Sequence, residues 1–170
     1  MNQTFVKSVT EQLPKLGLLQ DEPMKKHTTF RIGGPADYYA EPDMSQISKL
    51  KGIRGLVIGI GKGLSEIEVT EAVAQQSTAQ DFTAQDNGHI ITAGAGAILA
   101  AVAAKAAEAS LSGLEFASGI PGSVGGAVVM NAGAYGGEIK DVLIDATVLT
   151  AEGELKTVTR DELDLSYRHS

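Results

Sequence analysis

The stretch GIPGSVGGAVVMNAGAYGG, residues 119–137, limits the possible folds of this chain more than any other feature. Its 19 positions carry no charged side chain and are rich in glycine. The glycines follow no single period, so neither one helix nor one strand accounts for them. Glycine permits positive φ and close backbone approach, at an entropic cost that a plain surface loop would not justify.

Composition leaves two interpretations of this stretch open. In one, strand and helix pack tightly through small residues. In the other, main-chain N–H groups line an uncharged wall that suits a flat or anionic ligand. The side chains that offer strong hydrogen bonds in the stretch are Ser123, Asn131 and Tyr135.

Charge and composition exclude several classes of function. The formal net charge is −7, and the longest basic cluster is the pair Lys25-Lys26, so we expect no nucleic-acid partner. The chain has no cysteine, which excludes disulfides and thiol nucleophiles. The histidines His27, His89 and His169 show no metal-ligand spacing, and we expect no metal site.

The sequence also argues against a membrane segment. The most apolar segment, residues 93–109, is interrupted by Lys105 and Glu108 and is too short to span a bilayer. The N-terminus MNQTFVKSVTEQL lacks the apolar region of a signal peptide. We therefore expect a cytoplasmic protein without a membrane partner.

The pattern of elements predicts an α+β fold. Helical spacing or composition predicts helices over residues 3–13 and 97–110. Residues 28–32 and 37–40 predict a hairpin around Gly33-Gly34-Pro35, and residues 142–150 and 154–159 predict a second one. Further strands are expected at residues 56–60, 66–69 and 89–93, and an exposed loop at 75–88.

Two shorter glycine segments are weaker candidates for anion binding. Gly59-Ile60-Gly61-Lys62-Gly63 follows a strand but lacks the third glycine and the helix of a dinucleotide fingerprint, so a turn between strands is favoured. Gly94-Ala95-Gly96 precedes a helix, and there too a plain turn is favoured.

Three segments together resemble one enzyme family: HTTFRIGGPADYYAEP, LSGLEFASGIPGSVGGAVVMNAGAYGGEIKDV and the terminal LSYRHS. They look like the UDP-N-acetylenolpyruvoylglucosamine reductases, also called UDP-N-acetylmuramate dehydrogenases. This resemblance implies a bacterial oxidoreductase of peptidoglycan precursor synthesis. It would use NADPH, through bound FAD, to reduce an enolpyruvyl ether of a UDP-sugar to a lactyl ether.

The resemblance also implies a fold and a set of site residues. The fold is the two-subdomain FAD-binding fold of vanillyl-alcohol-oxidase type, here truncated, with residues 1–62 as a shortened first subdomain and 63–170 as the second. Arg168 matches the active-site arginine, whose fixed charge could stabilise an enolate, and Tyr167 would lie near the substrate. The implied cofactor-binding residues are Gly94, Gly96, Ile120, Pro121, Gly122, Ser123, Val124, Gly125, Gly126, Asn131, Ala132, Gly133, Ala134, Tyr135 and Gly136.

The chain departs from the family pattern in two places. Between Glu41-Pro42 and Gly52-Ile53-Arg54-Gly55 the family usually has a further helix, a strand and a Gly-x-Gly-Ser-Asn loop that grips the FAD pyrophosphate, whereas this chain has only DMSQISKLK. Family members also continue past Tyr-Arg-x-Ser into a substrate domain, which supplies a proton-donating serine and an assisting glutamate. Because proton donation is a positioned general-acid step, we expect that this chain alone does not turn over.

Two hypotheses follow. The chain is a portion of the FAD-dependent reductase, or it is a diverged, non-catalytic module for flavin binding or protein interaction. An oxidising flavoprotein of the same superfamily is disfavoured, because the Tyr-Arg-x-Ser ending resembles the reductases specifically.

Overall fold

A computed structural model of the chain describes residues 3–28, 30–47, 56–71 and 88–170. It divides into two units, each described separately below. The first comprises Met1–Gly63 with Leu149–Leu155, and the second comprises Leu64–Val148 with Lys156–Ser170. In the part of the chain that is described, no helix has the length and apolarity needed to span a membrane. The exposed loop predicted at 75–88 lies, up to residue 87, outside the described residues.

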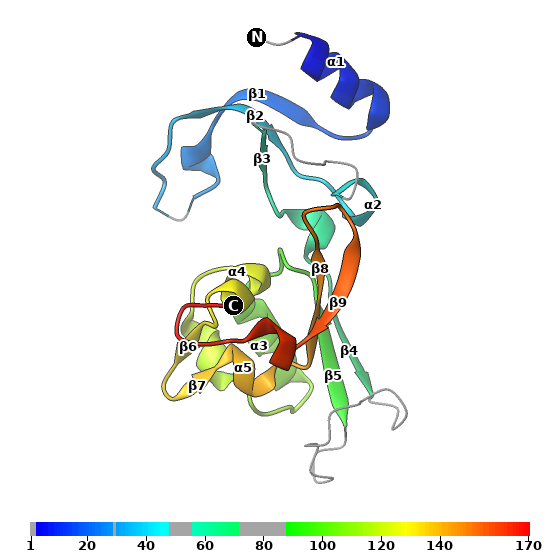
Figure 1. The fold of residues 1–170 in the computed structure, drawn as a ribbon. Coiled ribbons are helices and arrows are strands. Elements are labelled where there is room, and N and C mark those ends of the chain that lie inside the picture. The colour runs from blue at the N-terminus through cyan, green and yellow to red at the C-terminus, as the bar shows by residue number, and fades with distance from the viewer. Residues whose placement is uncertain (1–2, 29, 48–55, 72–87) are drawn as a thin grey trace. The chain divides into compact units, whose positions relative to one another are not determined.

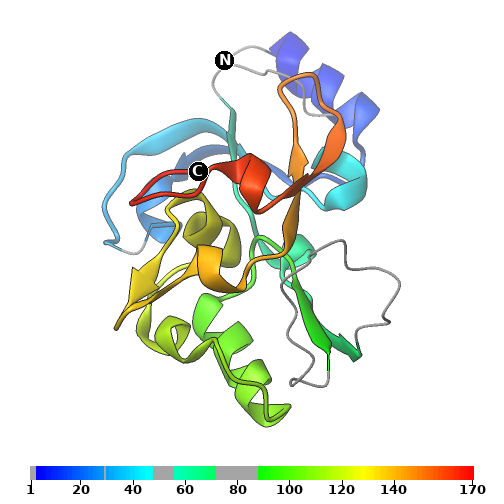
Figure 2. The same cartoon turned by 60° about the horizontal axis from the view of Figure 1, so that its bottom comes forward.

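The first unit contains a helix and a three-stranded sheet (Figures 1 and 2). Strand β1 pairs antiparallel with β2, and β3 pairs with β2 in parallel, so the strand order is β1-β2-β3. The elements are α1 (Gln3–Gln12), β1 (Leu18–Pro23), η1 (Met24–Lys26), β2 (Pro35–Ala40), α2 (Met44–Ile47), β3 (Leu56–Ile58) and η2 (Lys62–Leu64).

Helix α1 forms where helical spacing predicted it, because its apolar residues recur on one face. Val9 and Leu13 are buried together with Leu16 and Ala40, which form one hydrophobic cluster. The Phe5 ring lies 4.4 Å from the Tyr38 ring, between centroids. The N-terminal segment is therefore fastened to the sheet by apolar contacts.

The prediction of a hairpin between residues 28–32 and 37–40 is wrong. Strand β2 pairs instead with β1, at Leu18–Pro23. The Thr28 hydroxyl donates to the Ile32 carbonyl at 2.8 Å and accepts from the Ile32 N–H at 3.2 Å. Arg31 adopts a left-handed φ of 52°, and Phe30 is 87% exposed. These local hydrogen bonds replace a strand ladder, so the β-prone residues form a loop.

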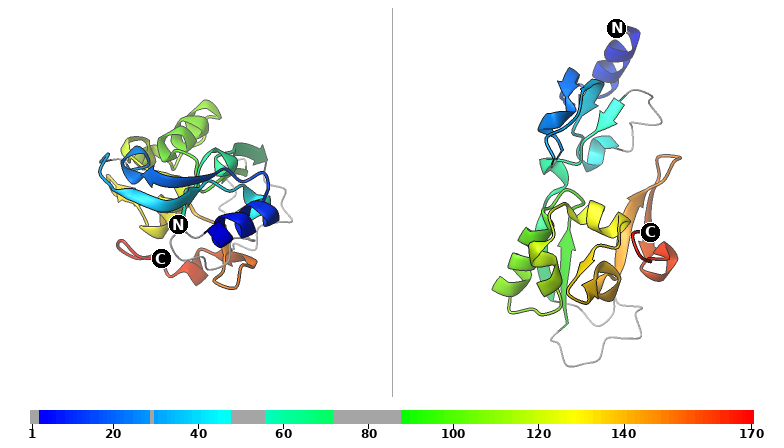
Figure 3. Two further views of the ribbon diagram at one scale, coloured as in Figure 1. Left: turned by 90° about the horizontal axis from the view of Figure 1, so that it is seen from above. Right: turned by 90° about the vertical axis from the view of Figure 1, so that its left-hand side faces the viewer.

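The second unit contains the remaining elements, apart from Leu149–Leu155 at the turn of the β8–β9 hairpin, which belong to the first. Its predicted helix, the strands near 66–71 and 89–93 and the C-terminal hairpin are confirmed, with shifted bounds. Helix α3 contacts the β4–β5 ribbon (Figure 3). The elements are β4 (Ile67–Glu71), β5 (His89–Ala93), α3 (Leu99–Glu108), η3 (Glu115–Gly119), α4 (Val124–Val129), β6 (Gly133–Ala134), β7 (Gly137–Glu138), α5 (Ile139–Val142), β8 (Asp145–Leu149), β9 (Leu155–Thr159) and η4 (Asp161–Leu163).

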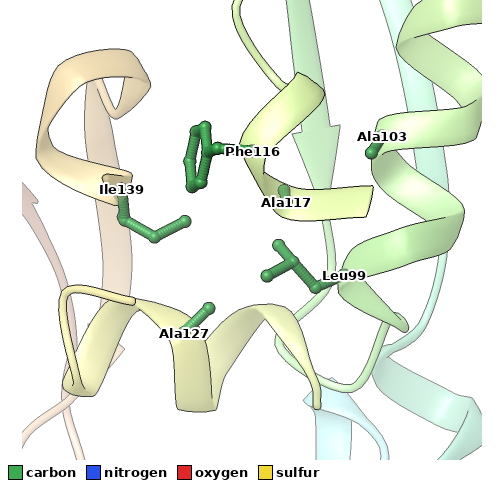
Figure 4. Packing of buried hydrophobic residues seen from close by; sticks show 6 residues of the cluster. All are labelled: Leu99, Ala103, Phe116, Ala117, Ala127 and Ile139. Atoms are coloured by element: carbon green, nitrogen blue, oxygen red, sulfur yellow. The ribbon is translucent and has the colours of Figure 1, made fainter. Parts of the chain in front are cut away.

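The core of the second unit lies under the glycine-rich stretch. Leu99, 2% exposed, Phe116, 7% exposed, and Ile139 point into the same space (Figure 4). The other buried members are Ala103, Ala117 and Ala127. Because half of the six side chains in this cluster are alanine, η3 can approach α3 closely.

Candidate functional site

Main-chain hydrogen bonds bring together two of the segments predicted to bind cofactor. The Val124 N–H donates to the Ala97 carbonyl at 2.9 Å, and the Gly125 N–H donates to the Ala95 carbonyl at 2.8 Å. The Leu99 N–H donates back to the Gly122 carbonyl at 3.0 Å. The loop that contains Gly94 and Gly96 therefore lies directly against the first half of the glycine-rich stretch.

The stretch is not a featureless loop but a series of short elements. Ser123 begins α4, since its hydroxyl oxygen accepts from the Gly126 N–H at 3.4 Å, as an N-cap does. After α4 the chain forms the β6–β7 hairpin, in which Gly133 pairs with Glu138 and Ala134 with Gly137 (Figure 1). Several short elements thus account for glycines that no single helix or strand explains.

One group of glycines is required by packing. A Cβ on Gly125 would lie 3.0 Å from the Ala95 Cβ, and one on Gly133 would lie 2.7 Å from the Gly137 carbonyl oxygen. A Cβ on Gly137 would lie 2.9 Å from the Phe116 ring, and one on Gly94 would overlap the Leu64 carbonyl. For these positions tight packing, one of the two interpretations left open by composition, is correct.

A second group of glycines has no packing role. No described atom would lie within 4 Å of a Cβ on Gly119, Gly122 or Gly136. Gly122 and Gly136 have φ values of +145° and +88°, which favour glycine on conformational grounds. The backbone is therefore bare at three places on an uncharged loop, and this surface admits close approach of a flat ring system.

The turn of the β6–β7 hairpin presents an aromatic ring. Tyr135 and Gly136 form a two-residue loop in which both φ values are positive, 53° and 88°, as in type I′ turns. A non-glycine residue is uncommon in this conformation. Tyr135 is 99% exposed. Of the three hydrogen-bonding side chains in the stretch, it is the one that faces outward.

Asn131 is turned inward instead. It is 4% exposed, with its side-chain amide donating to the Glu138 carboxylate at 2.6 Å and accepting from the Lys140 N–H at 3.0 Å. The Glu138 carboxylate also pairs with the Lys140 ammonium at 2.5 Å, and this hydrogen bond raises the pKa of Lys140. Glu138 and Lys140 were not predicted from the sequence, although the Glu138-x-x-Asp141 spacing of a capping box was a signal for Glu138.

The terminal Tyr-Arg-x-Ser segment forms a tight turn of its own (Figure 2). Ser166 and His169 exchange two main-chain hydrogen bonds of 3.1 Å, which leaves Tyr167 and Arg168 at the tip. Tyr167 is 86% exposed, and the Arg168 guanidinium lies 5.5 Å from the centre of its ring. Within the described residues no carboxylate forms an ion pair with Arg168, so its charge is not neutralised locally.

The segment Gly59–Gly63 is a turn between strands, as favoured from the sequence. It follows β3 and leads through η2 into β4. A Cβ on Gly59 would overlap the Tyr39 hydroxyl, and one on Gly61 would overlap the Glu41 carboxylate. The Tyr39 hydroxyl donates to Glu41 at 2.6 Å, and burial together with this bond raises the pKa of Tyr39. A carboxylate against Gly61 repels a phosphate, which disfavours anion binding here.

The exposed backbone of the glycine-rich stretch is sterically compatible with FAD. The isoalloxazine ring of FAD is flat and polar at one edge, and bare backbone at Gly119, Gly122 and Gly136 can contact such a ring without steric hindrance. No group of acidic or histidine side chains suited to a metal ion occurs in the described part of the chain.

Comparison with known families places the chain in one class. Residues 43–159 match the family described as FAD binding domain. This match covers more than half of the chain, so the chain belongs to the FAD-binding domain family. Its fold is an α+β FAD-binding fold, as the sequence predicted, and the cofactor of the class is FAD.

Individual relatives carry a more specific name. The chain is 83% identical, over its whole length, to a UDP-N-acetylenolpyruvoylglucosamine reductase of Agathobacter rectalis, and covers 60% of that protein. It is 47% identical over 88% of its length to the reductase of Lachnoclostridium phytofermentans, of which it covers 52%. The resemblance inferred from the motifs is thereby confirmed, and none of these relatives favours the non-catalytic alternative.

A solved structure agrees with this assignment. The crystal structure of the UDP-N-acetylenolpyruvylglucosamine reductase from Thermus caldophilus is 26% identical, with a TM-score of 0.62, over 91% of this chain and 56% of that one. The chain therefore spans little more than half the length of these relatives. The alignment with the Agathobacter rectalis protein has 194 positions, 24 more than the 170 residues of this chain.

Proposed function

We propose that this chain is the FAD-binding portion of a UDP-N-acetylenolpyruvoylglucosamine reductase, acting with NADPH as hydride donor on the enolpyruvyl ether of a UDP-sugar. The observation that carries the proposal is the 83% identity to such a reductase over the whole chain. The juxtaposition of the Gly94–Gly96 loop with the glycine-rich stretch supports it, because both segments are predicted to bind the cofactor.

In this proposal residues 1–62 are the first FAD-binding subdomain and residues 63–170 are the second. The second subdomain contains the glycine-rich stretch, residues 119–137, against which we propose that the flavin ring lies. Its contribution is steric: bare backbone at Gly119, Gly122 and Gly136 lets a flat ring approach.

Bound FAD would supply the hydride that it receives from NADPH. Arg168 then acts on the substrate: when hydride adds to one carbon of the double bond, negative charge develops on the neighbouring carbon and its carboxylate, and a guanidinium stabilises it. A guanidinium is a fixed charge, and within the described residues no carboxylate forms an ion pair with Arg168. Tyr167, on the same exposed turn, contacts the substrate beside it.

Completion of the reaction needs a proton on the second carbon, delivered by a positioned acid. No residue of this chain matches the proton-donating serine or the glutamate of the family. We therefore expect the chain alone to bind FAD without turning over.

The test is the colour of the purified protein. Retention of flavin absorbance after gel filtration, or uptake of added FAD, is the expected result, and a colourless protein that takes up no FAD would refute cofactor binding. With FAD bound, NADPH is added anaerobically, and we expect no substrate-dependent reoxidation. Turnover by this chain alone would refute the need for a separate acid.

A further inference from the structure

Asn131 occupies an unusual position at the end of α4. Its side chain is 4% exposed, and its backbone is left-handed with φ of 40°. A buried amide is costly unless both of its ends are hydrogen-bonded. Both the nitrogen and the oxygen of the Asn131 amide are hydrogen-bonded, and the chemistry of their partners determines the orientation of the amide.

The orientation of the amide follows from the chemistry of its partners. The Glu138 carboxylate can only accept, so it receives the Asn131 Nδ2–H at 2.6 Å. The Lys140 main-chain N–H can only donate, so it binds the Asn131 Oδ1 at 3.0 Å. The Asn131 side chain, at the end of α4, is thus bonded both to Glu138, which ends β7, and to the first turn of α5.

Glu138 extends this connection. Its carboxylate caps α5, its N–H donates to the Asp141 carboxylate at 2.9 Å, and the Lys140 ammonium pairs with it on the outer side. The side chains of Glu138 and Lys140 are 32% and 44% exposed, so the ion pair itself adds little. The stronger interaction is the charge-assisted hydrogen bond from the buried Asn131 amide to the Glu138 carboxylate.

The segment between Asn131 and Glu138 is the β6–β7 hairpin. Its tip carries Tyr135 in a left-handed conformation, which costs an L-residue roughly 1–2 kcal/mol. Such a conformation persists only where surrounding contacts enforce it. The hydrogen bond between Asn131 and Glu138 joins the two ends of the hairpin and so limits the conformations of its tip.

We propose that Asn131 and Glu138 are positioning residues for FAD: their hydrogen bond holds the β6–β7 hairpin in the conformation that presents Tyr135 and Gly136 to the cofactor. This inference rests on the proposed function. A hairpin ordered before binding loses less conformational entropy on binding, and the affinity for FAD is correspondingly higher.

The test exchanges donor and acceptor across the pair. In Asn131→Asp two carboxylates face one another and the hydrogen bond is lost. In Glu138→Gln the amide oxygen still accepts from Asn131. In the double variant the new amide at 138 donates to the new carboxylate at 131, so the bond is restored with reversed polarity. Gln12→Glu, which adds the same charge on the exposed surface of α1, is the matched control.

Two quantities are measured for each variant: amide hydrogen exchange of residues 132–137, and the dissociation constant for FAD from quenching of its fluorescence. We expect N131D to accelerate exchange and to raise the dissociation constant about tenfold, as for loss of a buried charge-assisted hydrogen bond. E138Q should change the constant less than about threefold. The double variant should recover most of the loss, and Q12E should match the unmodified chain.

The outcomes separate this inference from the proposed function. An unmodified chain that binds no FAD overturns the proposed function and the ligand named here. FAD binding that N131D leaves unchanged, or a double variant no better than N131D, overturns the positioning role alone. If N131D does not fold, Glu138→Ala tests the same bond by removing the acceptor, and unchanged exchange and affinity in E138A would also overturn the positioning role.

Discussion

Gly137 offers the most direct test of how the glycine-rich stretch is built. A Cβ at this position would lie 2.9 Å from Cδ1, 3.1 Å from Cγ and 3.2 Å from Cβ of Phe116. Phe116 is 7% exposed and packs among Leu99, Ala117 and Ile139, so its ring has little room to retreat. Gly137→Ala should therefore overpack this core.

The size of the effect follows from two opposing contributions. An added methyl group in a packed core costs about 1–3 kcal/mol, and replacing glycine by alanine returns about 0.4–1 kcal/mol through the unfolded state. The expected net loss is about 1–2 kcal/mol, or a melting temperature lower by about 2–8 °C for a chain of this size. Differential scanning calorimetry of the unliganded protein measures it.

Gly119→Ala is the matched control, because no described atom would lie within 4 Å of its Cβ. Its melting temperature should equal or slightly exceed that of the unmodified chain, while its affinity for FAD should fall if the flavin lies against this position. Phe116→Leu in the Gly137→Ala background should restore part of the lost stability. Equal melting temperatures for Gly137→Ala and the unmodified chain would refute the packing argument.

Three further predictions concern the site and its surroundings. Arg168→Ala, made at the matching position of a full-length relative, should lower turnover far more than flavin content, and equal losses would make it a structural residue. Tyr135→Asn should stabilise the unliganded chain by up to about 1 kcal/mol in chemical denaturation, because asparagine tolerates left-handed φ; a destabilised variant would contradict this. Hydrogen bonds from the Thr159 N–H and hydroxyl lower the pKa of Glu162. The Glu162 carboxylate therefore contributes to stability above its ordinary pKa, and this contribution is lost as the pH falls through its lowered pKa. An NMR titration that gives an ordinary pKa for Glu162 would be inconsistent with these hydrogen bonds.

Local composition predicted the elements whose structure depends on near neighbours. Helix α3 follows from its run of alanine and leucine, and the β8–β9 hairpin from the turn residues between its strands. The pairing of β1 with β2 was missed. Half of the β1 sequence LLQDEP is polar, and which strand pairs with β2 depends on the loop that Thr28 and Arg31 impose.

The separate roles of the glycines were also beyond local prediction. Gly137 and Gly136 are adjacent and chemically identical, yet one packs against Phe116 and the other faces open space. Phe116 is distant along the chain, so only the folded arrangement distinguishes the two. The same holds for Asn131, which the sequence analysis placed at the cofactor and whose side chain is instead bonded to Glu138. Its place among the cofactor-binding residues stays a prediction.

The sequence by itself determined the family, because the block around residues 119–137 is long, non-repetitive and specific, and the terminal Tyr-Arg-x-Ser agrees with it. It also determined that the stretch carries no charge, which is a property of composition. Tertiary structure decided which glycines are buried, which backbone is bare and which polar side chains remain available. Those properties depend on atoms brought together from separate elements, and no pattern within a single element encodes them.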